Sequence, residues 1–396
     1  MQAFLQKYPW SILAAGALIQ ILTGIPSAWG VFQQPVCEGY GLSAEDGALI
    51  FSFIICFFGI GCILGGLVQD RAGPRAAGLS GAALLAGGFL LGGLAVPDGS
   101  PWLFWALFSA PVGLGCAFLY PAVMSCAQKW YAGRKGLATG VIGGAVGLSG
   151  AALTALGRFA VGAWGIRGAF AALGVLMGAV CGGAAALLED PQGAAAAPAR
   201  QAQRQAKDYT VGQMVRTPQY RLLTAAVCLS TPPVLLFSPV IVQLAQERGL
   251  PEQGALACIW AGSLCSAAGR LAMPWLSDRI GRRAADLILF AALAGLSAAF
   301  AFAGGWWVLA AYCALTFCYA GQAAVLPAAV TDLFGPQNSG VNYGFVALGM
   351  SAGSVGFPLL ARALGLQAGR HWLAVGAAAA GFALVWRLRP TQGRRL

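Results

Sequence analysis

Twelve long apolar runs constrain what this chain can fold into more than any other feature of its sequence. A helix needs roughly 20 mostly apolar residues to cross a bilayer. Runs of about this length lie at 10–32, 47–69, 76–96, 102–126, 136–157, 168–188, 220–243, 254–277, 284–303, 306–331, 340–361 and 371–388. Long continuous runs are typical of helices, whereas the strands of a membrane barrel are short and alternate in polarity. The sequence therefore predicts an all-α membrane protein with twelve transmembrane helices.

Charged residues are few and unevenly distributed. Only 9% of the 396 residues are charged, against about a quarter in a soluble domain, so the surface is expected to face the lipid bilayer. If both termini are cytoplasmic, most Lys and Arg residues fall in inner segments, as the positive-inside rule favours. These residues are Lys7, Arg71, Arg75, Lys129, Arg134, Lys135, Arg200, Arg204, Lys207, Arg216, Arg221, Arg279, Arg282, Arg283, Arg387, Arg389, Arg394 and Arg395. The net charge of +11 is attributed to loops beside anionic lipid, and no nucleic-acid partner is expected.

The chain divides into two similar halves. Asp70, Arg71, Gly73 and Arg75 follow the second run, and Asp278, Arg279, Gly281 and Arg283 follow the eighth run at a constant offset of 208 residues. The longest charged connection separates the sixth run from the seventh. These features predict an N-terminal six-helix bundle over 1–188, a cytoplasmic linker over 189–219 and a pseudo-symmetric C-terminal six-helix bundle over 220–396. Internal duplication of this kind favours a transporter that rocks one bundle against the other around a central site.

The loop after the second run carries a family resemblance. Its pattern G-x-x-x-D-R-x-G-x-R, from Gly66 to Arg75, resembles the signature loop of the major facilitator superfamily, and the loop after the eighth run is a weaker copy. With two copies and a central linker, the resemblance covers essentially the whole chain. We expect these loops to act as conformational switches, in which Asp70 and Asp278 at helix ends are clasped by the arginines that follow. The alternative is a charge cluster that only sets membrane orientation.

A narrower resemblance comes from spans four, eight and eleven. Six short segments resemble the oxalate/formate antiporter and bacterial monocarboxylate porter branch: Tyr120–Pro121, Lys129–Tyr131, Arg134–Gly140, Gly269–Arg270, Trp275–Arg282 and Asn342–Gly344. The segment Ser27–Pro35 fits this branch less closely. The resemblance implies a small organic anion as substrate. It also implies a substrate-binding arginine at Arg270 and a substrate-contacting tyrosine at Tyr120.

Arg270 also stands out on physical grounds. It lies inside the apolar run 254–277, where a charge costs at least about 2.5–3.5 kcal/mol unless it faces a wet cavity or a partner. Because no buried carboxylate is evident to neutralise it, we expect its partner to be the substrate. Guanidinium binds carboxylate through two parallel hydrogen bonds and stays protonated. The alternative is an arginine that pairs with backbone carbonyls at a helix break near Pro274.

The other candidate substrate-binding residues carry hydroxyl or amide groups. Ser263 and Ser266 share one face of the eighth helix with Arg270, because they are spaced by three and four residues. Further hydrogen-bonding candidates are Tyr319 in the tenth span, Tyr343 in the eleventh, and the amides of Gln33 and Gln322. For each of these side chains, packing or an interfacial position is the competing interpretation.

Two departures from the related carriers bear on substrate and coupling. Some oxalate exchangers carry a second cation in span eleven, where this chain has Gly349-Met350-Ser351, so a monocarboxylate is favoured over a dianion. Animal proton-coupled lactate carriers have an aspartate one turn before the arginine, where this chain has Ser266. No Asp or Glu is expected to be buried elsewhere, so the usual proton relay is missing. Protons or a counter-transported anion remain the candidate coupling partners.

The sequence thus predicts a secondary transporter of small monocarboxylates, such as formate, lactate or pyruvate, with oxalate also considered. We expect a protein of the bacterial inner membrane that is monomeric in function and is not an enzyme. No cofactor or metal is expected, since no CxxC pair or phosphate-binding loop is present. The alternatives are a major facilitator exporter of drugs or other metabolites, and a membrane protein that does not transport.

Overall fold

The computed structural model describes residues 2–95, 100–131, 135–191, 208–335, 338–366 and 369–389, and the regular structure of these residues is helical. The helical elements are α1 (Gln2–Lys7), α2 (Trp10–Thr23), α3 (Ile25–Tyr40), α4 (Ala44–Leu94), α5 (Pro101–Phe104), the π-helical η1 (Trp105–Ser109), α6 (Ala110–Trp130), α7 (Lys135–Ala185), α9 (Val211–Met214), α10 (Pro218–Ser230), α11 (Pro232–Leu235), the 3₁₀-helical η4 (Ser238–Val240), α12 (Ile241–Glu247), α13 (Glu252–Ile280), α14 (Arg282–Phe302), α15 (Trp306–Phe334), α16 (Ser339–Ala363) and α17 (Arg370–Arg387).

Ten helical segments of the described residues are long and apolar enough to cross a membrane. Two of them come from α4, which has non-helical backbone angles at Gly73. A third, Leu137–Ala185, contains a second such break at Gly165 and therefore accommodates two of the expected spans. The 18 residues of α17 extend about 27 Å at 1.5 Å per residue, close to the thickness of a bilayer core. The arrangement is compatible with twelve spans.

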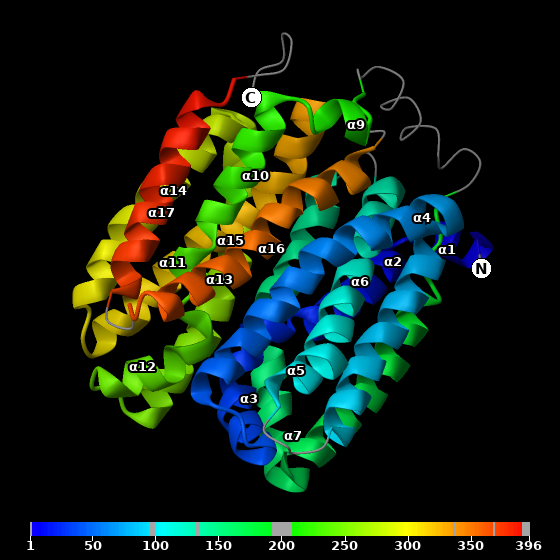
Figure 1. Cartoon of the computed structure of the whole chain (residues 1–396). Helices are drawn as coiled ribbons and strands as arrows, with labels where there is room; N and C mark the ends of the chain where they lie inside the picture. Colours follow the sequence, from blue (N-terminus) through cyan, green and yellow to red (C-terminus); the bar gives the residue numbers. More distant parts are fainter. Residues whose placement is uncertain are drawn as a thin grey trace.

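The helices form two bundles that lie side by side, with the N-terminal half in blue to teal and the C-terminal half in green to red (Figure 1). One hydrophobic core consists of residues between Leu5 and Leu188, with the addition of Leu235. A second consists of residues between Ala226 and Val385. A third combines residues of both halves, among them Cys62 and Tyr343. Each half therefore packs largely on itself, and the third cluster joins them.

Helices α4 and α16 bring the two bundles into contact. Gly344 of α16 lies against the α4 backbone, where a Cβ atom would come within 2.9 Å of the Ile63 nitrogen. About two helical turns further along α16, the Ser351 hydroxyl donates a hydrogen bond of 2.8 Å to the Cys56 carbonyl. Small residues and interhelical hydrogen bonds of this kind hold helices together in lipid.

Helices α7 and α13 form the other long contact between the bundles. Gly147 of α7 leaves no room for a Cβ atom beside the backbone of Ala267 in α13, and Gly150 is equally close to the Ser263 hydroxyl. Glycines of span five therefore lie at the interface between the halves.

The first span of each half is broken. In the N-terminal half α2 ends at Thr23, and α3 begins at Ile25 with Pro26 in its first turn. In the C-terminal half α10 ends at Ser230, and α11 begins at Pro232. Proline suits the first turn of a helix but interrupts a preceding one, because it lacks a backbone N–H. Both halves thus place a helix break at corresponding positions of the repeat.

The outer surface of the bundles is largely apolar. In the 18-residue apolar stretch of each of the ten candidate spans, between 39% and 61% of the residues are buried inside the protein, so the remaining apolar side chains need an apolar solvent. Most tryptophans with exposed rings lie near helix ends or, for Trp164, beside the break at Gly165 of α7: Trp10, Trp102, Trp164, Trp275, Trp306, Trp307, Trp372 and Trp386. Trp260, inside α13, is the exception among the described residues. Tryptophan is enriched at the interface between lipid and water. The surface is that of a multi-pass membrane protein.

The described parts of the connection between the halves dock on both bundles. Lys129 at the end of α6 forms an ion pair of 2.5 Å with Asp190. Further along, the backbone N–H of Tyr209 donates to the Phe334 carbonyl at 2.8 Å, and α9 is closed by a capping box at Thr210. Residues 192–207 of the predicted linker lie outside the described residues.

Candidate substrate cavity

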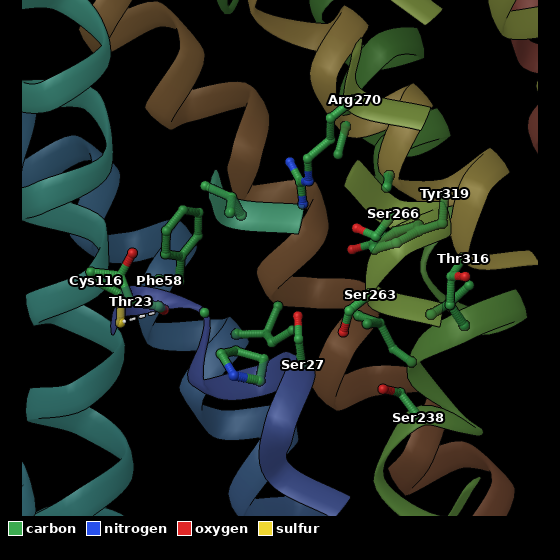
Figure 2. Close-up of a pocket in the computed structure, with 18 of the residues that line it drawn as sticks. Thr23, Ser27, Phe58, Cys116, Ser238, Ser263, Ser266, Arg270, Thr316 and Tyr319 are labelled. Atoms are coloured by element: carbon green, nitrogen blue, oxygen red, sulfur yellow. Dashed lines mark hydrogen bonds between the residues drawn. The ribbon is translucent and has the colours of Figure 1, made fainter. Parts of the chain in front are cut away.

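A cavity of about 180 Å³ lies between the two bundles. On the same measure a water molecule needs on the order of 15 Å³, so there is room for a small organic molecule. Both helix breaks contribute to the lining, through Gly24 and Pro26 on one side and Val234 and Leu235 on the other. Polar side chains from both halves project into the cavity (Figure 2), among them Thr23, Ser27, Ser238, Ser263, Ser266, Arg270, Thr316 and Tyr319.

Arg270 enters this cavity from α13, with its guanidinium group in the open space between the helices (Figure 2). Its Nε atom is buried and has no hydrogen-bond partner. Among the described residues, no carboxylate lies within 4.0 Å of the guanidinium nitrogens. The alternative interpretation placed backbone carbonyls near Pro274 as partners of Arg270; the Pro274 carbonyl itself accepts hydrogen bonds from Ser277 and Arg282 at 2.8 and 3.3 Å. Arg270 is therefore a cation that faces the cavity without a counter-charge from the described chain.

Hydroxyl groups surround this cation. Ser263 and Ser266 line the cavity on the same face of α13, as their spacing from Arg270 requires. The phenol groups of Tyr120, Tyr319 and Tyr343 also line the cavity, and all three lie within electrostatic range of the guanidinium. Phe58 packs edge-on against the Tyr120 ring at a centroid distance of 6.0 Å, which holds the ring in place.

The glutamines are distributed differently from the sequence-based expectation. Gln33 does not line the cavity, because its side-chain amide donates to the Ala44 carbonyl at 3.3 Å. Gln322 lines a separate small cavity. Gln20, which sequence reasoning missed, is 1% exposed and lines the main cavity. Its Oε1 atom accepts from the Thr23 hydroxyl at 2.9 Å, and its Nε2 atom has no partner. The sequence did carry a signal for this residue, because Gln20 is a polar residue in the middle of the first apolar run, 10–32.

The two switch loops share a backbone conformation. Gly73 has φ 85° and ψ 170°, and Gly281, at the equivalent position, has φ 93° and ψ 148°. A positive φ is strained for any residue with a Cβ atom, which explains why both copies have glycine at the turn. Arg71 and Arg75 are exposed, and the Asp70 side chain lies outside the described part of the chain.

In the second loop, Arg282 makes the contacts that were expected of its neighbours. Its guanidinium pairs with Asp278 and Ser277, and its Nε atom lies 3.2 Å from Asp332 at the end of α15. Arg279 instead lies over the Trp275 ring, 3.9 Å from the centroid. Arg283 donates to the carbonyls of Val385 and Trp386, the latter at the C-terminal end of α17. Sequence reasoning did not distinguish among three closely spaced arginines, because only their neighbours decide which one pairs.

One sequence-based expectation is wrong. No further Asp or Glu was expected to be buried, but Asp286 in α14 is 7% exposed. From the sequence, Asp286 was expected at a helix end, because it lies only four residues after the charged Arg282. The structure places it inside the C-terminal bundle because α14 begins at Arg282 and buries this face against its neighbours.

The fold and the cavity define a class of protein. A helical membrane protein built from two repeats, with a central cavity lined by broken helices, has the architecture of a secondary transporter. The sequence matches the Major Facilitator Superfamily over residues 12–304 and 234–395. The chain belongs to this family, and it is therefore a transporter and not an enzyme.

Individual relatives agree with this assignment. An uncharacterised MFS-type transporter of Escherichia coli K12, YhjX, is 25% identical over 88% of this chain and 87% of its own length. The oxalate:formate antiporter of Oxalobacter formigenes is 27% identical over 85% of this chain and 80% of its own length. Among solved structures, the Escherichia coli fucose:proton symporter FucP superposes with a TM-score of 0.64 at 16% identity, covering 96% of this chain and 98% of its own. The last likeness bears on the fold alone.

Proposed function

We propose that this protein transports small monocarboxylates, such as formate, lactate or pyruvate, and that Arg270 binds the substrate carboxylate. The observation that carries the proposal is the unpaired guanidinium group in the cavity. A buried cation without a partner is costly in a membrane protein, and a carboxylate supplies both the missing charge and two aligned acceptors. The named substrates of the Oxalobacter formigenes relative, oxalate and formate, are carboxylates.

The number of cations favours a singly charged substrate. Among the described residues that line the cavity, Arg270 is the one with a positive charge. A dianion would leave one of its charges without a fixed partner in an apolar setting, at a cost in free energy. The neighbouring groups Ser266, Tyr120, Tyr319 and Tyr343 are neutral hydroxyls that can donate to the second carboxylate oxygen or to a substrate hydroxyl.

In the cycle that we propose, the halves 1–188 and 220–396 rock about the cavity and expose it to each side of the membrane in turn. The anion enters, neutralises Arg270 and so lowers the cost of closing the cavity around the charge. The Lys- and Arg-rich loops with Gly73 and Gly281 face the cytoplasm of a bacterial cell, together with the linker 189–219 and both termini, in accordance with the positive-inside rule.

An exporter of drugs or other metabolites is the competing function. The buried Asp286 removes one argument against it, since such exporters usually carry an intramembrane acid. The positive charge of Arg270 in the main cavity nevertheless repels cationic ligands. A ligand panel that includes bulky cations therefore discriminates between the two functions.

The first test is ligand-dependent thermal stability of the purified protein. A ligand that binds the folded state raises the melting temperature by mass action, by an amount equivalent to about 2.7 kcal/mol at 100 times Kd. We expect formate, lactate or pyruvate to stabilise the wild type, and Arg270→Ala to abolish both this response and transport into proteoliposomes. Arg270→Lys should recover little, because the two-point geometry is lost.

Arg216→Ala is the matched control, because Arg216 is an exposed arginine that lies outside the cavity and its replacement changes the net charge equally. It should respond to carboxylates as the wild type does. Carboxylate transport by Arg270→Ala near the wild-type rate would contradict the proposed role of Arg270. Stabilisation by bulky cationic compounds, without a response to any carboxylate, would favour the exporter.

A further inference from the structure

Asp286 lines a second cavity, inside the C-terminal bundle. This cavity measures about 20 Å³ and is enclosed by α10, α14, α15, α16 and α17. A space of this size holds about one water molecule. Two buried oxygen atoms without a hydrogen-bond partner belong to its lining residues, namely Oδ1 of Asp286 and Oε1 of Gln322. Buried polar atoms are almost always paired in native proteins, so these two atoms indicate a site for a proton or a water.

Among the described residues, no cation forms an ion pair with Asp286. Arg282, four residues earlier on the same helix, lies within electrostatic range of it, but its guanidinium is already paired with Asp278, Asp332 and Ser277. An ionised carboxylate without a partner is expensive to bury, whereas a neutral carboxyl group needs only a hydrogen-bond acceptor.

The groups that face Asp286 from the packed helices are otherwise neutral. From α15 they are Tyr319 and the Gln322 amide. The residues that α10, α16 and α17 contribute do not titrate: they are Leu223, Ala226, Val227, Ser230, Met350 and Val385. Ser230 already donates its hydroxyl to the Val227 carbonyl at 2.8 Å, so it can only accept from Asp286. A protonated Asp286 therefore finds acceptors, and an ionised Asp286 lacks donors apart from the Gln322 amide and the Tyr319 hydroxyl.

The small cavity adjoins the substrate cavity. Tyr319, Ala323 and Met350 line both. The Tyr319 phenol also lies within electrostatic range of Arg270. One layer of side chains thus separates the carboxyl group of Asp286 from the cavity that contains the guanidinium group.

We propose that Asp286, positioned by Gln322, is a proton-binding site that couples anion movement to proton movement. This inference rests on the proposed anion site at Arg270. When the protein is empty, Arg270 is positive and Asp286 is ionised, with the Gln322 amide and the Tyr319 hydroxyl as its available donors; the charges of Arg270 and Asp286 then sum to zero. When an anion binds Arg270 and a proton binds Asp286, the charges sum to zero again.

In the half-loaded states these charges do not sum to zero. With the anion alone the C-terminal half holds one excess negative charge, and with the proton alone it holds one excess positive charge. Excess charge inside a membrane protein is costly, so the empty and the fully loaded forms reorient most readily. Each turnover then carries one anion and one proton in the same direction. The proton comes from water on the loading side, resides on the Asp286 carboxylate and is released to water on the other side.

The test compares proton uptake with anion binding. Purified wild type in weakly buffered detergent solution, with a pH indicator, should take up protons when formate or lactate is added. Asp286→Asn should keep the thermal response to the anion and anion exchange between proteoliposomes and medium. It should lose proton uptake, and it should lose accumulation driven by a pH gradient. Glu38→Gln, at an exposed carboxylate that contacts Gln34, is the matched control and should keep all four properties.

The outcomes separate this inference from the proposed function. If Asp286→Asn still accumulates the anion in response to a pH gradient, Asp286 is not the coupling site, although the anion site stands. If the wild type binds no carboxylate, the proposed function fails and this inference fails with it. Should Asp286→Asn not fold, Gln322→Leu provides the second test. It keeps the carboxyl group but removes a neighbour, and it should shift the pH of half-maximal transport while Arg270-dependent anion binding persists. An unchanged pH profile would overturn the assignment.

Discussion

Among the described residues that line the main cavity, one from each half carries a buried nitrogen atom without a hydrogen-bond partner. Arg270 Nε comes from α13 in the C-terminal half, and Gln20 Nε2 comes from α2 in the N-terminal half. A carboxylate has acceptor capacity for both. An anion held between them would contact both bundles at once. A substrate must make such contacts if its binding is to change the orientation of one bundle relative to the other.

Replacing Gln20 tests this role. Gln20→Leu should weaken the affinity for the carboxylate by about 10- to 150-fold, since a hydrogen bond to a charged group is worth about 1.5–3 kcal/mol. Folding should be little affected, because the Thr23 hydroxyl retains the Gln20 carbonyl as an acceptor at 3.3 Å. Titration of ligand-dependent thermal stability measures the change.

Gln34→Leu is the control for this experiment, because Gln34 is an exposed glutamine on α3 that does not line the cavity and donates its amide to Glu38 at 2.8 Å. Its carboxylate affinity should match that of the wild type. Equal affinity of the Gln20→Leu protein would mean that the substrate does not contact α2.

At the scale of helices, glycine determines how closely the bundles approach. On α7, Gly147 lies directly against Ala267 of α13, and Gly150 lies directly against Ser263. Without Cβ atoms at these positions the two backbones can lie in contact, and packing of this kind replaces the hydrophobic effect as the source of association in lipid. The position of Arg270 relative to the N-terminal half depends on this contact, since α13 carries Arg270.

Gly147→Ala should therefore destabilise the protein by about 1–3 kcal/mol, as overpacking typically does, and should lower the transport rate. Gly162→Ala is a matched substitution on the same helix, where a Cβ atom would have nothing within 4 Å. Since alanine is the better helix former by about 1 kcal/mol, this variant should be as stable as the wild type or more so. Thermal unfolding of both variants in detergent measures the difference. Equal stability of the two would mean that the α7–α13 contact is loose.

At the scale of the whole molecule, ion pairs join the halves at the end away from the Gly73 and Gly281 turns. Arg362 near the end of α16 lies 3.0 Å from Glu45 and 3.6 Å from Asp46 at the start of α4. Arg158 of α7 lies 3.8 Å from Glu252 at the start of α13. These side chains are between 19% and 70% exposed, and exposed ion pairs contribute about 0.2–1 kcal/mol. That is little for stability but enough to bias two conformations of nearly equal free energy.

Arg362→Gln should accordingly leave the melting temperature almost unchanged and favour opening at this end. Hydrogen–deuterium exchange should increase in the first turns of α4 and the last turns of α16. Arg167→Gln is the control, because Arg167 contacts the Ala95 carbonyl and the Tyr40 ring within its own half. Unaltered exchange in the Arg362→Gln protein would show that the ion pair does not keep this end closed.

The sequence by itself determined the class of the protein, the helical spans and the special position of Arg270. Each of these depends on a local property. The length of an apolar run decides whether a helix crosses a bilayer, and a charge within such a run is costly wherever the run lies. The glycines at 73 and 281 were likewise readable from the repeat, because a turn with positive φ favours glycine irrespective of distant contacts.

Only the tertiary structure decided which polar side chains meet. Gln33 faces the start of α4 and Gln20 faces the cavity, although both are glutamines in the first span. Arg282, and not Arg279 or Arg283, pairs with Asp278, and Asp286 is buried although it lies near a helix end. These outcomes depend on the rotation of each helix about its axis and on the helices packed against it. Both are set by contacts between residues far apart in the chain, which spacing along a single helix does not encode.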